Sequence, residues 1–274
     1  MSELAGATVV VTGGSSGVGA EAARMFADLG ARVTVVGSSA ARVAAVADAI
    51  GGTGRTVDFT RLADVVRLAA ELRDDLGRID VLAANAGRID PAGSTTADGI
   101  EANAQVNAIA PWLLLRELAP VLAGGRVVGT SSSAHLRATV EPQHYGEADG
   151  TGWMGAYGRA KLVSGVLLRE FGRRHPGTTV VDFHPGAISS GFDRSLTGFA
   201  KLAARVAQPF LDKPTDGARR LVALACADQG VDGRYYDRAK PAAGSPLLAD
   251  RALAAALWRR AQELTRGLPT RDLA

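Results

Sequence analysis

Short β-branched runs alternate with longer stretches of helical periodicity through most of this chain of 274 residues. The first strand-like run, Thr8–Thr12, is followed by Gly17–Leu29, in which Val18 and Phe26 fall on one helical face. Such alternation places consecutive strands in a mostly parallel sheet and their helices on both of its faces. The sequence therefore predicts an α/β fold, a doubly wound parallel sheet of about seven strands with helices on both sides.

The expected elements show no internal repeat, low-complexity linker or second core, so a single domain spanning residues 1–274 is predicted. The expected strands are Thr8–Thr12, Arg32–Val36, Arg55–Asp58, Ile79–Ala84, Arg126–Thr130, Thr178–His184 and Gly233–Tyr236. The expected helices are Gly17–Leu29, Ala40–Ile50, Leu62–Leu76, Asp98–Val121, Trp153–Arg173, Thr215–Cys226 and Asp250–Leu264. Pro111 predicts a kink or irregularity in the fourth of these helices.

Composition excludes several classes of partner. The net charge is only +3, and the arginines are scattered rather than gathered into a stripe, so no nucleic-acid partner is expected. The longest apolar stretch, Ala108–Leu115, is too short to cross a bilayer, and no secretory signal precedes the first strand. We therefore expect a cytoplasmic protein with no membrane partner. The histidines have no spacing that suggests a metal site, and His135 and His184 are interpreted as structural residues.

A glycine run lies between the first expected strand and the first expected helix. Gly13 allows a tight turn, while Gly17 and Gly19 allow a close approach of backbone to a pyrophosphate at the helix N-terminus. A glycine-rich turn alone is a weak signal, but this position is the one that a dinucleotide site requires in a Rossmann-type sheet. The sequence therefore predicts a dinucleotide-binding loop.

Tyr157 and Lys161 are four residues apart in an expected helix, so they share one face. A nearby ammonium group favours the phenolate form, and we therefore expect a lowered pKa for Tyr157 and a role in proton transfer. The alternative is a surface tyrosine and lysine that fall four residues apart by chance.

The spacing Thr-Gly-x-x-x-Gly-x-Gly and a series of later motifs resemble the short-chain dehydrogenase/reductase family over nearly the whole chain. The matching positions, in order, are Asp58, Asn85-Ala86-Gly87, Asn107, Ser131-Ser132, Tyr157, Lys161 and His184-Pro185-Gly186. The resemblance implies an NAD(P)-dependent enzyme that interconverts a carbonyl and an alcohol. It also implies a homo-oligomer, a dimer or tetramer, in which the helix carrying Tyr157 packs across subunits.

The resemblance also implies roles for individual residues. Tyr157 would exchange a proton with the substrate oxygen, Lys161 would hold the nicotinamide ribose, and Ser132 would bind the substrate carbonyl. Asn107 would complete a proton relay through water and Lys161. A strand-end hydroxyl without function is the alternative for Ser132. The expected cofactor contacts are Gly13, Ser15, Ser16, Gly17, Val18, Gly19, Ser38, Ser39, Arg42, Asp58, Phe59, Asn85, Ala86, Gly87, Tyr157, Lys161, Pro185, Gly186, Ile188 and Ser190.

The end of the second expected strand bears on the choice between NADP and NAD. An acidic residue there would bind the ribose hydroxyls and repel a 2′-phosphate, but this chain has Gly37-Ser38-Ser39. Ser38, Ser39 and Arg42 could contact a phosphate, so NADP is preferred. NAD stays open because position 38 lacks the arginine often found there in the resembled family.

A narrower resemblance is to the retinol-dehydrogenase-like branch of the family. It rests on the run Ser131–His135, the long gap from Ser132 to Tyr157, Thr96–Gly99, Gly233–Tyr236 and Leu257-Trp258. Gly129 and Ala110-Pro111 depart from that branch, as does the absence of the N-terminal membrane anchor of many animal members. We therefore expect a lipophilic or secondary-metabolite carbonyl as substrate, rather than retinol. The expected walls of its site are residues 136–153 and an apolar lid formed by Phe192, Leu196, Phe199, Leu202 and Phe210, although core packing explains the same five residues equally well.

Two alternatives to a reductase stay open at this stage. One is a protein that binds the nucleotide without catalysis, although all four candidate catalytic residues are present here. The other is non-redox acid/base chemistry, a dehydration or cyclisation, on the same fold.

Overall fold

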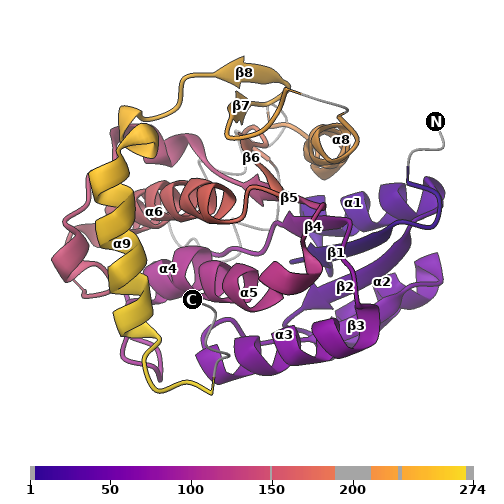
Figure 1. The fold of residues 1–274 in the computed structure, drawn as a ribbon, viewed down its shortest axis with the longest axis horizontal. Coiled ribbons are helices and arrows are strands. Elements are labelled where there is room, and N and C mark those ends of the chain that lie inside the picture. Colours follow the sequence, from indigo (N-terminus) through magenta and orange to yellow (C-terminus); the bar gives the residue numbers. More distant parts are fainter. Residues whose placement is uncertain (1–3, 149, 189–210, 228–229, 270–274) are drawn as a thin grey trace.

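A single sheet organises the computed structural model, which describes residues 4–148, 150–188, 211–227 and 230–269 (Figure 1). Its strand order is β3-β2-β1-β4-β5-β6-β7-β8. The strands are β1 (Thr8–Thr12), β2 (Arg32–Gly37), β3 (Thr53–Thr56), β4 (Val81–Ala84), β5 (Arg126–Thr130), β6 (Thr179–His184), β7 (Tyr235–Asp237) and β8 (Lys240–Ala242). Strands β1 to β7 pair in parallel, and β8 is antiparallel to β7.

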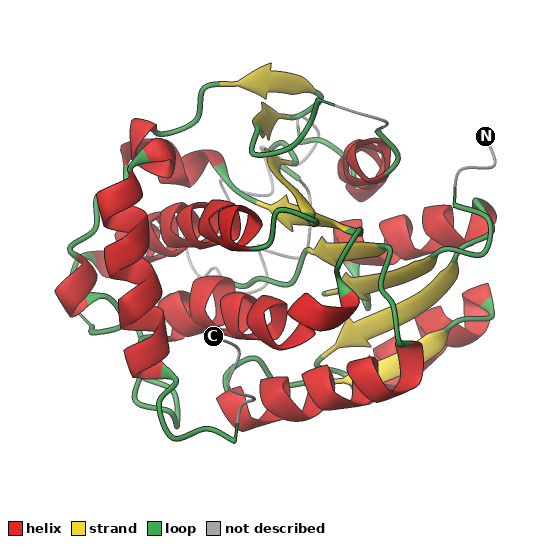
Figure 2. Ribbon diagram, in the orientation of Figure 1, coloured by secondary structure: helices red, strands yellow, loops and turns green. Residues whose placement is uncertain are grey.

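Helices cover both faces of the sheet, as Figure 2 shows. One face carries α1 (Gly17–Asp28), α2 (Ala40–Ile50) and α8 (Pro214–Ala225). The other carries α3 (Leu62–Leu76), α5 (Ala110–Leu118) and α6 (Gly152–Arg174). All five residues of β1 are buried, as expected for a strand between two helical layers. The predicted doubly wound α/β fold is confirmed.

Strands β4 and β7 begin two residues later than expected, at Val81 and Tyr235, and the other main differences lie at the edges of the sheet. Strand β3 covers Thr53–Thr56 rather than Arg55–Asp58, because it pairs with β2 and β2 ends at Gly37. Strand β8 makes the count eight rather than seven. Its three residues, Lys-Pro-Ala, are all exposed and carry no strand signal, and proline is tolerated because the strand lies at an edge.

The helix expected at Asp98–Val121 is divided into pieces. A short turn, α4 (Ala102–Ala104), leads into a π-helical turn at Gln105–Ile109, and α5 follows from Ala110. Pro111 has no N–H to donate to the carbonyl of Asn107, so the ordinary α-helical bond cannot form there. The expected irregularity is present.

Within the described ranges, no helix has both the length and the apolarity that a membrane crossing requires.

The last helix, α9 (Arg251–Leu264), packs across the outer side of α6 (Figure 1). The ring of Trp258 meets Trp112 of α5 edge-on, with centroids 5.3 Å apart, and the guanidinium of Arg174 lies 4.5 Å from the Trp258 ring. Aromatic and cation–π contacts of this kind add to the burial of the indole. Part of the α6 surface is thus covered within the same chain.

We expect Trp258→Ala to lower the free energy of unfolding by about 3 kcal/mol, because it leaves a large cavity between α5, α6 and α9. Urea unfolding followed by circular dichroism measures this. Met154→Ala is the control, since the Met154 side chain is 62% exposed and its loss should change the free energy by less than about 0.5 kcal/mol. Equal stabilities of the two variants would contradict the proposed packing role of α9.

Candidate functional site

The carboxyl ends of β1 and β4 lie side by side where the strand order reverses, the usual ligand crevice of a doubly wound sheet. The hydroxyl of Thr12, the last residue of β1, joins these ends. Its Oγ1 accepts hydrogen bonds from the amides of Asn85 (3.0 Å) and Ala86 (3.1 Å) and donates one to the carbonyl of Ala83 (3.2 Å). The turn after β4 is therefore fixed against the glycine loop.

Three glycines of the loop, Gly13, Gly14 and Gly19, have no room for side chains. A Cβ on Gly13, whose φ is +65°, would lie 2.9 Å from the Cα of Ala86, and one on Gly19 would overlap the Gly13 carbonyl. Helix α1 begins at Gly17 after Ser16, whose side chain makes no capping bond, and its first turn carries no acidic residue. This helix N-terminus therefore suits an anionic group.

The end of β2 likewise leads into a helix N-terminus that suits an anionic group. A Cβ on Gly37 would lie 2.6 Å from the Oγ of Ser15, so the two loops touch. Helix α2 also begins without a side-chain cap, at Ser39, and without an acidic residue in its first turn. Ser38 and Arg42 are exposed beside it. The three positions expected to contact a phosphate are thus gathered at one helix N-terminus.

Asp58 and Phe59 follow β3 at the same edge of the sheet. The Asp58 carboxylate accepts hydrogen bonds from the amide (2.9 Å) and the hydroxyl (2.7 Å) of Thr60, so it shapes its own turn. Asp58 is exposed, whereas Phe59 is buried.

The structure brings the four predicted catalytic residues together. Ser132 is hydrogen-bonded to the Tyr157 phenol. The Lys161 Nζ lies 5.8 Å from the centroid of the Tyr157 ring and donates to the carbonyl of Thr130 at 3.0 Å. A Cβ on Gly87 would lie 2.8 Å from the Oδ1 of Asn107 and 3.2 Å from the Lys161 Nζ. Gly87 therefore lets the turn after β4 contact both side chains.

The Asn107 side chain is committed to the backbone. Its Oδ1 accepts from the amide of Arg88 (3.2 Å), and its Nδ2 donates to the carbonyls of Arg88 (2.7 Å) and Asn103 (3.0 Å). The amide thus holds the loop after Gly87, and Asn107 itself lies within the π-helical turn.

Burial dominates the electrostatics of the Tyr–Lys pair. Lys161 is 4% exposed, and burial lowers its pKa to about 8. Burial raises the pKa of Tyr157, and the hydrogen bond with Ser132 opposes that rise only in part. The expectation of a lowered tyrosine pKa is therefore wrong for this structure. The Lys161 ammonium is directed at the Thr130 carbonyl, so it does not offset the desolvation of the phenol.

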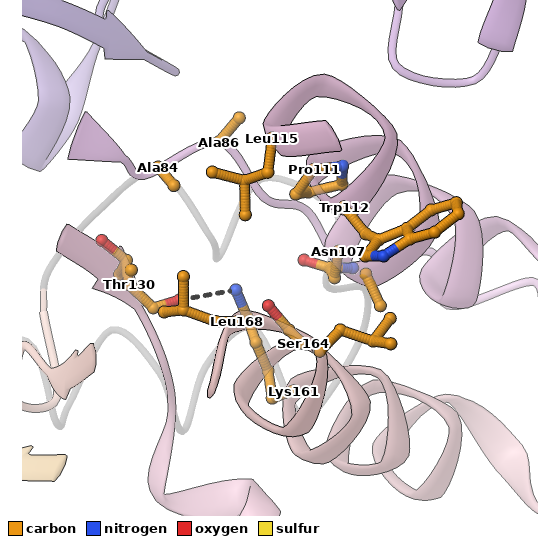
Figure 3. A pocket seen from close by; sticks show the side chains of 13 residues that line it. Ala84, Ala86, Asn107, Pro111, Trp112, Leu115, Thr130, Lys161, Ser164 and Leu168 are labelled. Atoms are coloured by element: carbon orange, nitrogen blue, oxygen red, sulfur yellow. Dashed lines mark hydrogen bonds between the residues drawn. The ribbon is translucent and has the colours of Figure 1, made fainter. Parts of the chain in front are cut away.

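A small cavity of about 20 Å³ lies behind the Lys161 amine (Figure 3). Asn107, Thr130, Lys161 and Ser164 supply its polar lining, and the apolar part comes from α5, α6, Ala84, Ala86 and Ala108. The volume is sufficient for one water molecule.

The loop after β6 is held by α8. Arg220 donates to the carbonyl of Pro185 and pairs with Asp212 at 3.2 Å. Gly186, with φ of +97°, has no space for a Cβ beside that pair. Ile188 forms a parallel bridge to Asp212, so Pro185, Gly186 and Ile188 lie at the same edge as the glycine loop. Ser190 and the expected lid residues lie outside the described residues.

Several residues that build this site were not predicted from the sequence. Thr12 supports the turn after β4, and Thr130 accepts the hydrogen bond of the Lys161 amine. Ser164 lines the cavity, and Arg220 holds the loop after β6. Thr12 and Thr130 each occupy the last position of a parallel strand, which is a signal that the sequence carried. Ser164 and Arg220 act through tertiary contacts, which no local pattern reveals.

Comparisons with known proteins identify similar chains. A profile described as short chain dehydrogenase matches residues 7–201. The "Putative daunorubicin C-13 ketoreductase DnrU" of Streptomyces sp. (strain C5) is 36% identical, with 93% of this chain and 91% of that protein aligned. Human retinol dehydrogenase 12 is 31% identical, with 96% of this chain and 87% of that protein aligned.

Solved structures agree with the fold. A protein from Mycobacterium paratuberculosis superimposes with a TM-score of 0.77 and 27% identity, covering 95% of this chain and 94% of that one. A short chain dehydrogenase from Burkholderia cenocepacia, solved in complex with NADP, superimposes with a TM-score of 0.69 and 27% identity, covering 87% and 98%.

Because burial depresses the Lys161 pKa from 10.5 to about 8, the unfolded chain binds one more proton than the folded chain between these values. Stability should therefore rise with pH across this window, by about 3 kcal/mol in total. We expect the free energy of unfolding of the parent, minus that of Lys161→Met, to increase between pH 8 and about pH 10.5. Parallel urea titrations measure the difference, and a constant difference would contradict the burial of a titrating amine.

Proposed function

From the premise that this chain belongs to the short chain dehydrogenase family, in its retinol-dehydrogenase-like branch, we propose that it is an NADPH-dependent reductase of a lipophilic ketone or aldehyde. The family makes it an NAD(P)-dependent oxidoreductase of carbonyls and alcohols. One observation carries the finer proposal, namely the convergence of Ser132, Tyr157 and Lys161 beside a glycine loop that accepts no side chains.

The residues at the carboxyl edge of the sheet fit a dinucleotide. Gly13 and Gly19 let the loop pack closely against the backbone where a Cβ would collide, and the uncapped start of α1 offers backbone N–H groups to a pyrophosphate. Ser38, Ser39 and Arg42 would hold the 2′-phosphate at the start of α2. Asp58 and Phe59 would contact the adenine, and Pro185 to Ile188 would lie near the nicotinamide. When bound, the nicotinamide supplies the hydride.

The protein's own residues supply the proton and the orientation. With its pKa raised by burial, the Tyr157 phenol stays protonated at neutral pH and is ready to donate to a carbonyl oxygen. The Ser132 hydroxyl, bonded to Tyr157, would bind the same oxygen and stabilise its developing negative charge. Lys161 would hold the ribose, and one water in the cavity behind its amine would return a proton towards Tyr157.

The names of the relatives support a proposal for the substrate class. The Streptomyces relative is named for a ketone of an aromatic natural product, and the vertebrate relatives for retinol, so both names denote large lipophilic molecules. We propose that this chain reduces a ketone of a polycyclic or terpenoid secondary metabolite, with residues 136–153 forming one wall of its site. We further propose one domain and a cytoplasmic location.

We expect Tyr157→Phe to reduce kcat with NADPH by about 10²- to 10⁴-fold, because the proton donor is lost while the ring is kept. The assay is NADPH oxidation at the nicotinamide absorbance with a panel of ketones and aldehydes. Tyr236→Phe, on β7 against the opposite core, is the control and should keep full activity. Tight NADPH binding without turnover of any carbonyl would favour a binding protein or non-redox chemistry.

We expect Arg42→Ala to lower kcat/KM for NADPH by about 10- to 100-fold and to leave kcat/KM for NADH unchanged, since a charge-assisted hydrogen bond to the 2′-phosphate is lost. Arg24→Ala on α1, where Arg24 pairs with Glu21, is the matched control. A parent enzyme that prefers NADH would contradict the cofactor assignment.

A further inference from the structure

His135 is the one of the four histidines whose side chain is wholly enclosed, with an exposed fraction of 0%. It lies in the short 3₁₀ turn Ser133–Arg137 that follows β5, three residues after Ser132. An imidazole that is buried in this way requires a hydrogen-bond partner for each ring nitrogen. Nothing in the proposed reaction uses this ring.

Its two partners define a single protonation state. The amide N–H of Ser245 donates to the Nε2 at 3.2 Å, so Nε2 must carry a lone pair. The Nδ1 lies 2.5 Å from the carbonyl oxygen of Ser132, which can only accept, so Nδ1 must carry the hydrogen. A protonated ring would turn an N–H towards the N–H of Ser245. The contacts therefore favour the neutral Nδ1–H tautomer.

The Ser132 backbone is the part of the site that this ring holds. The Ser132 carbonyl also accepts the His135 amide at 3.2 Å, while its Oγ accepts the amide of Ala134 at 3.3 Å and bonds to the Tyr157 phenol. Ser132 is extended, with φ of −152° and ψ of 147°, and no regular element fixes it. The two bonds from His135 therefore restrain the peptide that carries the Ser132 hydroxyl.

The other side of the ring is held by a segment far along the chain. Gly244 has φ of +66°, and a Cβ there would lie 3.4 Å from the His135 Nε2 and 2.8 Å from the Cδ1 of Leu248. The Tyr235 ring of β7 packs edge-on against the imidazole with centroids 4.8 Å apart. Asp182 and His184 of β6 are the ionisable groups that face it from the sheet.

We propose that His135 is a positioning residue that links the C-terminal segment Gly244–Ala249 to the active site. As the neutral Nδ1–H tautomer between Ser245 and Ser132, it fixes the direction of the Ser132 hydroxyl towards Tyr157. This inference rests on the proposed function, because it assigns His135 to the same reaction.

Two amide substitutions separate the two bonds. The Asn side chain of His135→Asn places an amide N–H where Nδ1 lies and keeps the bond to the Ser132 carbonyl. The longer Gln side chain of His135→Gln places its oxygen near the position of Nε2, so it keeps the bond to Ser245 and loses that to Ser132. We expect His135→Asn to retain kcat within about threefold, whereas His135→Gln loses on the order of 100-fold in kcat with little change in KM. His175→Asn, at the carboxyl end of α6 and away from the site, is the control.

The pH profile gives a readout that a purely structural role would not change. The bond from Ser132 lowers the Tyr157 pKa against the effect of burial, and the Lys161 Nζ lies 5.8 Å from the centroid of the Tyr157 ring. In the alcohol-oxidising direction Tyr157 must accept a proton, so activity rises with pH through its pKa. We expect this limb to move to higher pH in His135→Gln and to stay in place in His135→Asn.

A spectroscopic measurement on the parent protein does not depend on whether any variant folds. The imidazole ¹⁵N spectrum should show a protonated Nδ1 and an unprotonated Nε2, and a protonated Nε2 would overturn the proposal. If the parent enzyme is active, equal kcat values and unchanged pH profiles in His135→Asn and His135→Gln would also overturn the proposal. A parent that turns over no carbonyl would instead overturn the proposed function, and this inference with it.

Discussion

The hydroxyl of Thr12 joins the ends of β1 and β4, and the candidate site is built outward from that junction. Parallel strands all finish at one edge of the sheet, so the glycine loop, the turn at Asn85–Gly87 and the Ser132 turn meet there. The Thr12 bonds bring the turn close enough for Gly87 to contact Asn107 and Lys161. The positions of the glycine loop, Lys161 and Tyr157 thus depend on a few hydrogen bonds at the strand ends, and not on the helices alone.

Burial sets the chemistry of the pair that this junction supports. Burial depresses the pKa of the Lys161 amine, whose hydrogen-bond partner is the Thr130 carbonyl, and burial raises the pKa of Tyr157. Both shifts favour the neutral forms, as desolvation requires. A protonated phenol is the form that a carbonyl reductase needs as a proton donor. Ser132 opposes the shift, so the orientation of its hydroxyl adjusts the acidity of Tyr157.

Local patterns predicted the parts that local chemistry determines. The glycines after β1 could be predicted because no side chain fits at Gly13 or Gly19. The shared face of Tyr157 and Lys161 could be predicted because the helix that carries them is regular. The direction of the Tyr157 pKa shift could not be predicted, because it depends on tertiary burial and on where the Lys161 amine points. Strand β8 carries no strand signal in its exposed Lys-Pro-Ala. From the sequence His135 is interpreted as a structural residue, and its bond to Ser245, 110 residues further along the chain, could not be predicted from a local pattern.

The central step of the proposed function is hydride transfer from bound NADPH to a carbonyl carbon beside Tyr157. The direct measurement is a single turnover with NADPH deuterated at both C4 positions and a lipophilic ketone, with mass analysis of the product. The account predicts an alcohol that carries one deuterium on its carbinol carbon. Cofactor that binds tightly, with no labelled alcohol formed from any ketone tested, would contradict it.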